Sequence, residues 1–178
     1  MMDKSVYRLE FYVVAFAVVF ASAYLAWQAT HGGVVSHHLL DRRDLPAFSN
    51  WWGLAIIPLT GGFAAWSVRR RAAVDRNALR SAMAAAFCAL VAGVTLSVAF
   101  IVDEGGNAPL FVLLSALACG FIWPTYRGEY IFGFVVGMSF TFGLVLPAII
   151  ALIAAALSAA FYFLVRPVFV RLLRRVFA

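Results

Sequence analysis

Charged side chains are scarce in this sequence of 178 residues: 12% are Asp, Glu, Lys or Arg, whereas 65% are hydrophobic. A soluble domain is nearer one quarter charged and one half apolar. The sequence also contains several long apolar runs, and no Asp, Glu, Lys, Arg or His lies in the middle of any of them. This pattern excludes an ordinary soluble domain and predicts an integral membrane protein.

Cysteines and catalytic signatures are equally sparse. The two cysteines, Cys88 and Cys119, both lie in apolar runs, so we interpret them as buried small residues rather than as a disulfide or metal pair. The sequence has no G-x-S-x-G, Walker A, H-E-x-x-H or C-x-x-C motif, and it indicates no cofactor. The lack of ionisable residues within the runs argues against a proton-driven transporter, although sodium sites built from backbone carbonyls remain open.

The longest uncharged run, residues 130–165, determines how many membrane crossings we expect. As one straight helix its 36 residues would reach roughly 54 Å, whereas the hydrocarbon core of a bilayer is about 30 Å thick. Pro147 lies near its middle, where a helix should break or kink. We therefore predict two short spans joined by a tight turn at Leu146, Pro147 and Ala148. One long helix, which gives five spans in all, is the alternative.

The predicted fold is a single all-α domain, residues 1–178, because no polar linker separates the apolar runs. It is a polytopic transmembrane helix bundle with six spans, at about 11–29, 51–68, 82–102, 109–123, 130–146 and 148–165. Within the second span, Pro58 followed by Gly61 and Gly62 predicts a kink or partial unwinding.

The distribution of basic residues indicates the orientation of this bundle. All but two of the fourteen Lys and Arg residues lie on one side of the six-span arrangement, which the positive-inside rule assigns to the cytoplasm. Both termini are then cytoplasmic, and only Arg42 and Arg43 lie outside. The expected location is a bacterial inner membrane, with membrane lipids as partners. These flanking arginines explain the net charge of +6, so we expect no nucleic-acid partner.

The most polar connection, residues 31–50, contains the candidate metal ligands His37, His38 and Asp41. We predict a short interfacial helix over residues 35–43, on which each histidine lies three or four residues from the aspartate. Imidazole and carboxylate groups suit zinc or another divalent ion. The alternative is a solvated loop whose histidines bind nothing and whose aspartates and arginines form local ion pairs.

Other polar and aromatic residues suggest either a ligand site or structural anchors. The candidates for holding an anionic headgroup or a polar ligand are Arg42, Arg43, Asn50, Trp51, Trp52, Arg127 and Glu129. In the structural alternative, Asn50 caps the second span and the two tryptophans lie at the membrane interface. Arg127 and Glu129 then belong to a cytoplasmic turn with aromatic anchors.

Small residues recur at helical spacing on two of the predicted spans. They are Ala85, Ala89, Gly93 and Ser97 on the third span, and Gly133 and Gly137 on the fifth. Such stripes allow two helices to approach closely. They predict either packing inside the bundle or a homodimer interface.

The leading hypothesis for function is a non-enzymatic membrane bundle that serves as an interaction or accessory subunit, in a homo-oligomer or with a membrane partner. One alternative is a small-solute transporter or channel that uses kinked second and fifth spans. Another is a metal site, headgroup site or membrane enzyme at the outer face, built on His37, His38 and Asp41.

Overall fold

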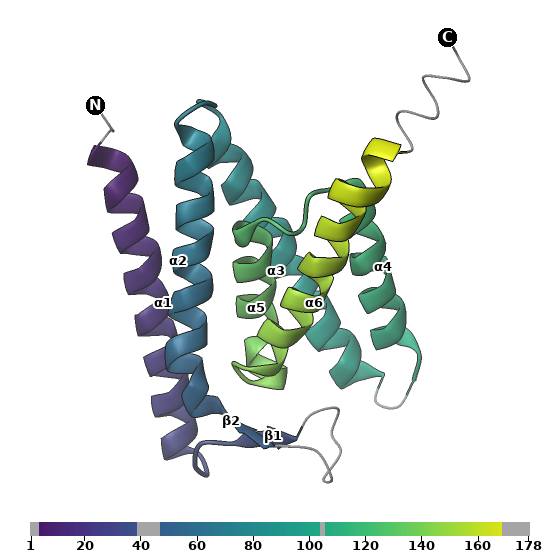
Figure 1. The fold of residues 1–178 in the computed structure, drawn as a ribbon. Helices are drawn as coiled ribbons and strands as arrows, with labels where there is room; N and C mark the ends of the chain where they lie inside the picture. Colours follow the sequence, from purple (N-terminus) through teal and green to yellow (C-terminus); the bar gives the residue numbers. More distant parts are fainter. Residues whose placement is uncertain (1–3, 39–46, 104–105, 169–178) are drawn as a thin grey trace.

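Six α-helices and one small hairpin make up the structure, a computed structural model that describes residues 4–38, 47–103 and 106–168 (Figure 1). The helices are α1 (Lys4–Thr30), α2 (Gly53–Ala72), α3 (Ala78–Val102), α4 (Ala108–Ile122), α5 (Gly128–Phe142) and α6 (Leu146–Ala160). A π-helical segment, Phe161–Val165, continues α6. The prediction of an all-α bundle is thus confirmed, apart from two strands of three residues each.

Within the described ranges, four helical segments are long and apolar enough to cross a membrane, which indicates an integral membrane protein. They are Arg8–Thr30, Asn50–Ala72, Ala78–Val102 and Leu146–Val168, each of 23 to 25 residues. At about 1.5 Å per residue, each exceeds a hydrocarbon core of about 30 Å. Helices α4 and α5 are also apolar, but each has only 15 residues, or about 22 Å.

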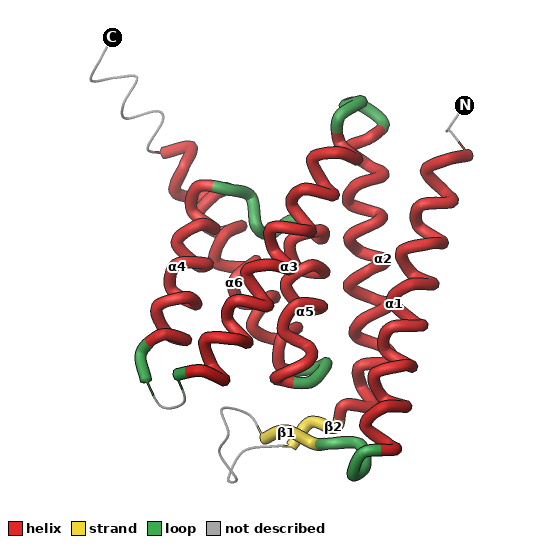
Figure 2. The backbone as a smooth tube through the Cα atoms, turned by 180° about the vertical axis from the view of Figure 1, so that it is seen from behind, coloured by secondary structure: helices red, strands yellow, loops and turns green. Residues whose placement is uncertain are grey.

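Helix α5 forms the centre of the bundle. Nine of its fifteen residues are buried, whereas α4 buries only Gly120 and lies at the periphery. Helices α2, α3 and α6 pack around α5, and phenylalanines of α1 contact it from the remaining side. Figures 1 and 2 show the start of α1 and the end of α6 at the same end of the bundle, with the hairpin at the opposite end.

The long uncharged run is divided between two helices, but the division is not where we predicted it. Helix α5 ends at Phe142 and α6 begins at Leu146, so the turn precedes Pro147. Gly143 has a φ of +73°, a conformation that favours glycine and ends the helix. Pro147 lies in the first turn of α6, where its missing N–H has no helical partner to lose. The proline therefore starts a helix instead of breaking one.

One other local prediction is wrong, and a second is only partly tested. The expected interfacial helix over residues 35–43 is replaced by strand β1 (Ser36–His38), which pairs antiparallel with β2 (Ala47–Ser49); residues 39–43 lie outside the described ranges. Two glycines with positive φ end α1 and redirect the chain into this hairpin. Helix α2 is continuous through Pro58, so the structure shows no partial unwinding there, and the kink that we gave as the other possibility stays a prediction. The remaining predicted spans each overlap one helix.

Candidate functional site

Asn50 connects three parts of the chain that are far apart in sequence. Its side-chain amide Nδ2 donates to Gln28 Oε1 at 3.2 Å, and its Oδ1 accepts from the backbone N–H of Leu144 at 3.1 Å. Gln28 in turn donates to the Tyr24 hydroxyl at 3.1 Å. These residues, which we call the Asn50 network, join α1, the start of α2 and the turn between α5 and α6.

The Asn50 network is closed to solvent and its hydrogen-bonding groups are engaged with one another. Asn50 is 1% exposed, Gln28 6% and Tyr24 8%. A Cβ atom added to Gly143 would lie 2.8 Å from Asn50 Nδ2, so the amide also requires glycine in the turn. Buried and paired in this way, Asn50 stabilises the turn, and within the described ranges its Oδ1 and Nδ2 both have protein partners.

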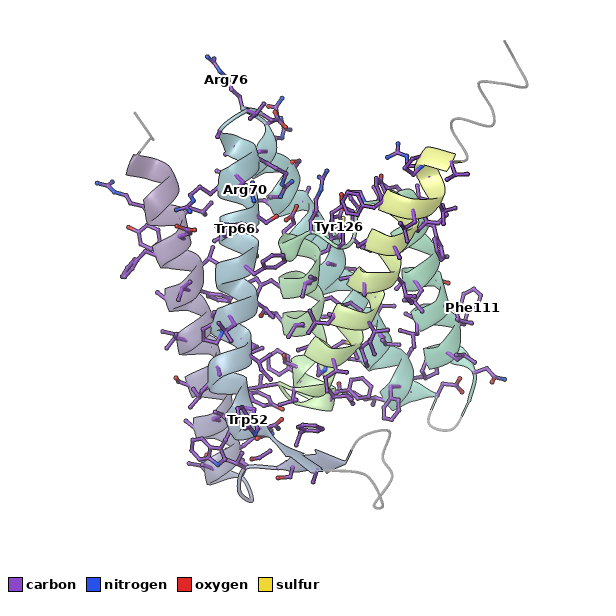
Figure 3. All side chains as sticks on the ribbon, viewed as in Figure 1. Trp52, Trp66, Arg70, Arg76, Phe111 and Tyr126 are labelled. Atoms are coloured by element: carbon purple, nitrogen blue, oxygen red, sulfur yellow. The ribbon has the colours of Figure 1, made fainter. Side chains whose placement is uncertain are left out.

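Trp51 and Trp52, which follow Asn50, have a different environment. Their exposed fractions are 58% and 63%. With Leu54 and Ala55 they line an open hollow of about 310 Å³ at the hairpin end of the bundle. Figure 3 shows Trp52 at this end. The three neighbours that we considered as one candidate ligand site therefore separate in the structure: Asn50 is directed into the core, whereas Trp51 and Trp52 are directed outward.

Glu129 lies at the first turn of α5 and is 3% exposed. Its Oε1 accepts from Arg71 Nη2 at 2.5 Å, while Oε2 is buried without a partner among the described residues. The adjacent Gly128 packs on the α2 backbone, where an added Cβ would lie 2.6 Å from Ala64 Cα. The ion pair thus ties α5 to α2 at the end of the bundle opposite the hairpin.

The sequence missed Arg71 as the partner of Glu129. Arg127, the predicted companion, is half-buried just before α5 and forms no ion pair with Glu129 in the described part of the chain. Arg71 is 58 residues away along the chain and belongs to a run of three arginines. No local spacing indicates such a pair.

The two predicted stripes of small residues lie against each other. Helices α3 and α5 run parallel, and a Cβ atom added to Gly93 would lie 2.6 Å from Phe134 O and 3.1 Å from Met138 N. Gly137 approaches the backbone of α3 in the same way, and Gly133 contacts Ala86 O. Ala85, Ala89 and Ser97 are buried along the same helix, and Ser97 Oγ has no hydrogen-bond partner among the described residues.

The candidate metal ligands are only partly visible. His37 and His38 lie in strand β1, paired with Phe48 and Ala47, while Asp41, Arg42 and Arg43 lie outside the described residues. Within the described ranges, no group of three His, Cys, Asp or Glu residues is close enough to hold a metal ion. The metal and headgroup interpretations of this connection therefore stay predictions.

The interpretation of the cysteines as buried is wrong. Cys88 on α3 and Cys119 on α4 are both exposed at the surface of the bundle. In a membrane, an apolar sequence context does not distinguish the inside of a bundle from its lipid-facing surface, because both are apolar.

A further contact holds the peripheral helix α4 in place. Ser158 of α6 is 2% exposed, and its hydroxyl donates to Gly120 O at 2.7 Å.

Comparison with known proteins identifies no matching family model, no matching curated protein and no matching solved structure.

Proposed function

We propose that this protein is a non-enzymatic membrane subunit: a six-span bundle of a bacterial inner membrane that works by binding a membrane partner or a second copy of itself. The observation that carries this proposal is the contact between α3 and α5. The glycines of α5 lie on the backbone of α3, with Gly137 Cα and Gly93 Cα at the centre of the contact. Close helix packing of this kind suits a scaffold.

The same contact argues against the transport alternative. That alternative uses the glycine face of α5 as part of a solute path, but this face is filled by α3. Helix α2 is continuous from Gly53 to Ala72, so no unwound backbone carbonyls are available there for a sodium site, although Pro58 lies inside the helix. The polar groups of the Asn50 network are likewise bonded to one another.

The orientation forms part of the proposal. Six crossings place both termini on the arginine-rich side, which we assign to the cytoplasm. Reporter fusions at the two ends, one active only in the cytoplasm and one only outside it, test this directly. Both ends should give the cytoplasmic signal; opposite signals from the two ends would overturn the six-span topology.

The two native cysteines provide the test for a partner. Because Cys88 and Cys119 are exposed on different helices, each probes a different face of the bundle. Native membranes are treated with a membrane-permeant bis-maleimide, using the wild type, Cys88→Ala, Cys119→Ala and the double variant as a control. We expect a cross-linked species that disappears in the double variant and in one of the single variants.

Two results would contradict the proposed function. One is the absence of cross-linked species together with a monodisperse monomer that co-purifies with no other protein. The other is solute flux in liposomes that is lost in Pro58→Ala, since a scaffold conducts nothing. Identification of the cross-linked species by mass spectrometry distinguishes a second copy from a different partner.

A further inference from the structure

Arg70 lies over an aromatic surface that faces outward from α2. Its guanidinium carbon is 5.0 Å from the centre of the Trp66 ring, and Phe63 stacks on the same tryptophan at 5.8 Å. The three residues are three or four positions apart, which places them on one face of the helix. Phe63 and Trp66 are 43% and 41% exposed, so this face contacts lipid.

The arginines on either side of Arg70 both pair with carboxylates. Arg69 pairs with Glu10 at 2.9 Å, and Arg71 pairs with Glu129 at 2.5 Å. In the described ranges, no carboxylate pairs with the guanidinium of Arg70. A cation–π contact uses the charge of the guanidinium and does not use its N–H donors, which form the fork that binds phosphate.

A second arginine repeats this arrangement at the same end of the bundle. The guanidinium of Arg166 lies 4.7 Å from the centre of the Tyr162 ring, just beyond α6. Tyr126 contacts both Tyr162 and the exposed Phe163, with ring centres 5.6 and 5.3 Å apart. Figure 3 shows Arg70 and Trp66 on α2 and Tyr126 beside α6, all towards the end opposite the hairpin.

We propose that Arg70 on Trp66, and Arg166 on Tyr162, are binding sites for the phosphate groups of anionic phospholipids. Amphipathic aromatic rings lie at the level of lipid headgroups, where the phosphates are. Trp66 is exposed on an apolar helix, and Tyr162 is half-buried beside the exposed Phe163, so both arginines lie next to apolar surface, which favours a phospholipid over a soluble phosphate ion. A zwitterionic lipid brings its own cation close to the arginine, so the sites select lipids of net negative charge. This proposal requires only that the chain is embedded in a membrane.

The test uses the full-length protein in native mass spectrometry, with equimolar phosphatidylglycerol and phosphatidylcholine of identical acyl chains. We expect the wild type to retain phosphatidylglycerol preferentially. Arg70→Gln should weaken that retention about fivefold, the change expected for one basic residue at an anionic surface. Trp66→Leu should weaken it as well, because the ring that orients the guanidinium is lost.

Arg76→Gln is the matched control. Arg76 is exposed in the loop between α2 and α3 and has no aromatic contact among the described residues, so its loss should change retention little. Arg70→Lys keeps the charge without the planar stack, and it should also lose preference. If Arg70→Gln does not fold, Arg70→Lys can be used in its place.

Three results would overturn the proposal. Equal losses from Arg70→Gln and Arg76→Gln would show that only the overall positive charge attracts lipid. Equal retention of the two lipids by the wild type would remove the selectivity. Displacement of phosphatidylglycerol by millimolar inorganic phosphate would identify a site for soluble anions instead.

Discussion

Gly137→Ala should destabilise the bundle, although alanine is the better helix former. In a helix interior, replacing glycine with alanine gains roughly 1 kcal/mol. At Gly137 the new methyl carbon would lie 3.1 Å from Val94 N and 3.2 Å from Gly93 Cα, and closer still to Leu90 O. All three atoms belong to the backbone of α3, so none can rotate away and the two helices must separate.

The size of the effect follows from these contacts. Overpacking costs about 1–3 kcal/mol, and contacts with rigid backbone place Gly137 at the upper end of that range. The net loss in the free energy of unfolding is then about 2 kcal/mol. Gly62→Ala is the matched control, because among the described residues its methyl group would meet only Val14 Cγ2, at 3.6 Å, an ordinary contact distance. It should be neutral or stabilise the protein by up to about 1 kcal/mol.

The assay is unfolding of the purified protein in detergent micelles by added dodecyl sulfate, followed by circular dichroism. The midpoint for Gly137→Ala should fall below that of the wild type, and the midpoint for Gly62→Ala should not. Equal midpoints for the two variants would refute the close approach of α3 and α5. A normal midpoint accompanied by loss of an oligomer would instead place the glycine face between two copies.

Two further predictions concern buried polar groups and use the same unfolding assay. Asn50→Ala leaves two buried hydrogen-bonding partners unsatisfied and should lower the free energy of unfolding by about 2–4 kcal/mol. The control Ser49→Ala removes one exposed 3.4 Å hydrogen bond and should lower it by less than about 1 kcal/mol. Equal losses in the two variants would refute the role of the Asn50 network. Glu129→Ala removes a buried carboxylate from Arg71, which is one quarter exposed and still donates to Ser67 O, and should cost about 1–3 kcal/mol, against below about 1 kcal/mol for Glu10→Ala in the more exposed pair. A smaller loss for Glu129→Ala than for Glu10→Ala would contradict the burial of the first pair.

The features that could be predicted from the sequence are those that depend on long apolar runs and regular spacing. The helical class, the membrane environment and the division of the run at residues 130–165 all follow from length and hydrophobicity. The position of the division does not, because two candidates compete in this run. The sequence draws attention to Pro147, yet a positive φ at Gly143 ends the helix earlier.

The contacts that could not be predicted join residues far apart along the chain. Asn50 meets the backbone of Leu144, and Arg71 meets Glu129, at separations of 94 and 58 residues. From the sequence, Asn50 is explained as a helix cap and Arg71 as a basic residue flanking a span, so nothing local points to Leu144 or Glu129 as their partners. The faces of the helices are equally hard to assign, since the lipid-facing surface is as apolar as the core, and Cys88 and Cys119 were misplaced for that reason.

Helices α4 and α5 have the same length but affect the surrounding bilayer differently. The central α5 is enclosed by protein, so its apolar length does not have to match that of the lipid chains. The peripheral α4 presents Leu110, Phe111 and Leu114 outward along only about 22 Å, some 8 Å less than the usual hydrocarbon thickness. In the six-span topology that we propose, acyl chains beside α4 would have to shorten or disorder to match it, at a fraction of a kcal/mol per Å. The protein would then carry a thinned annulus on one flank, which would favour thinner regions of its membrane.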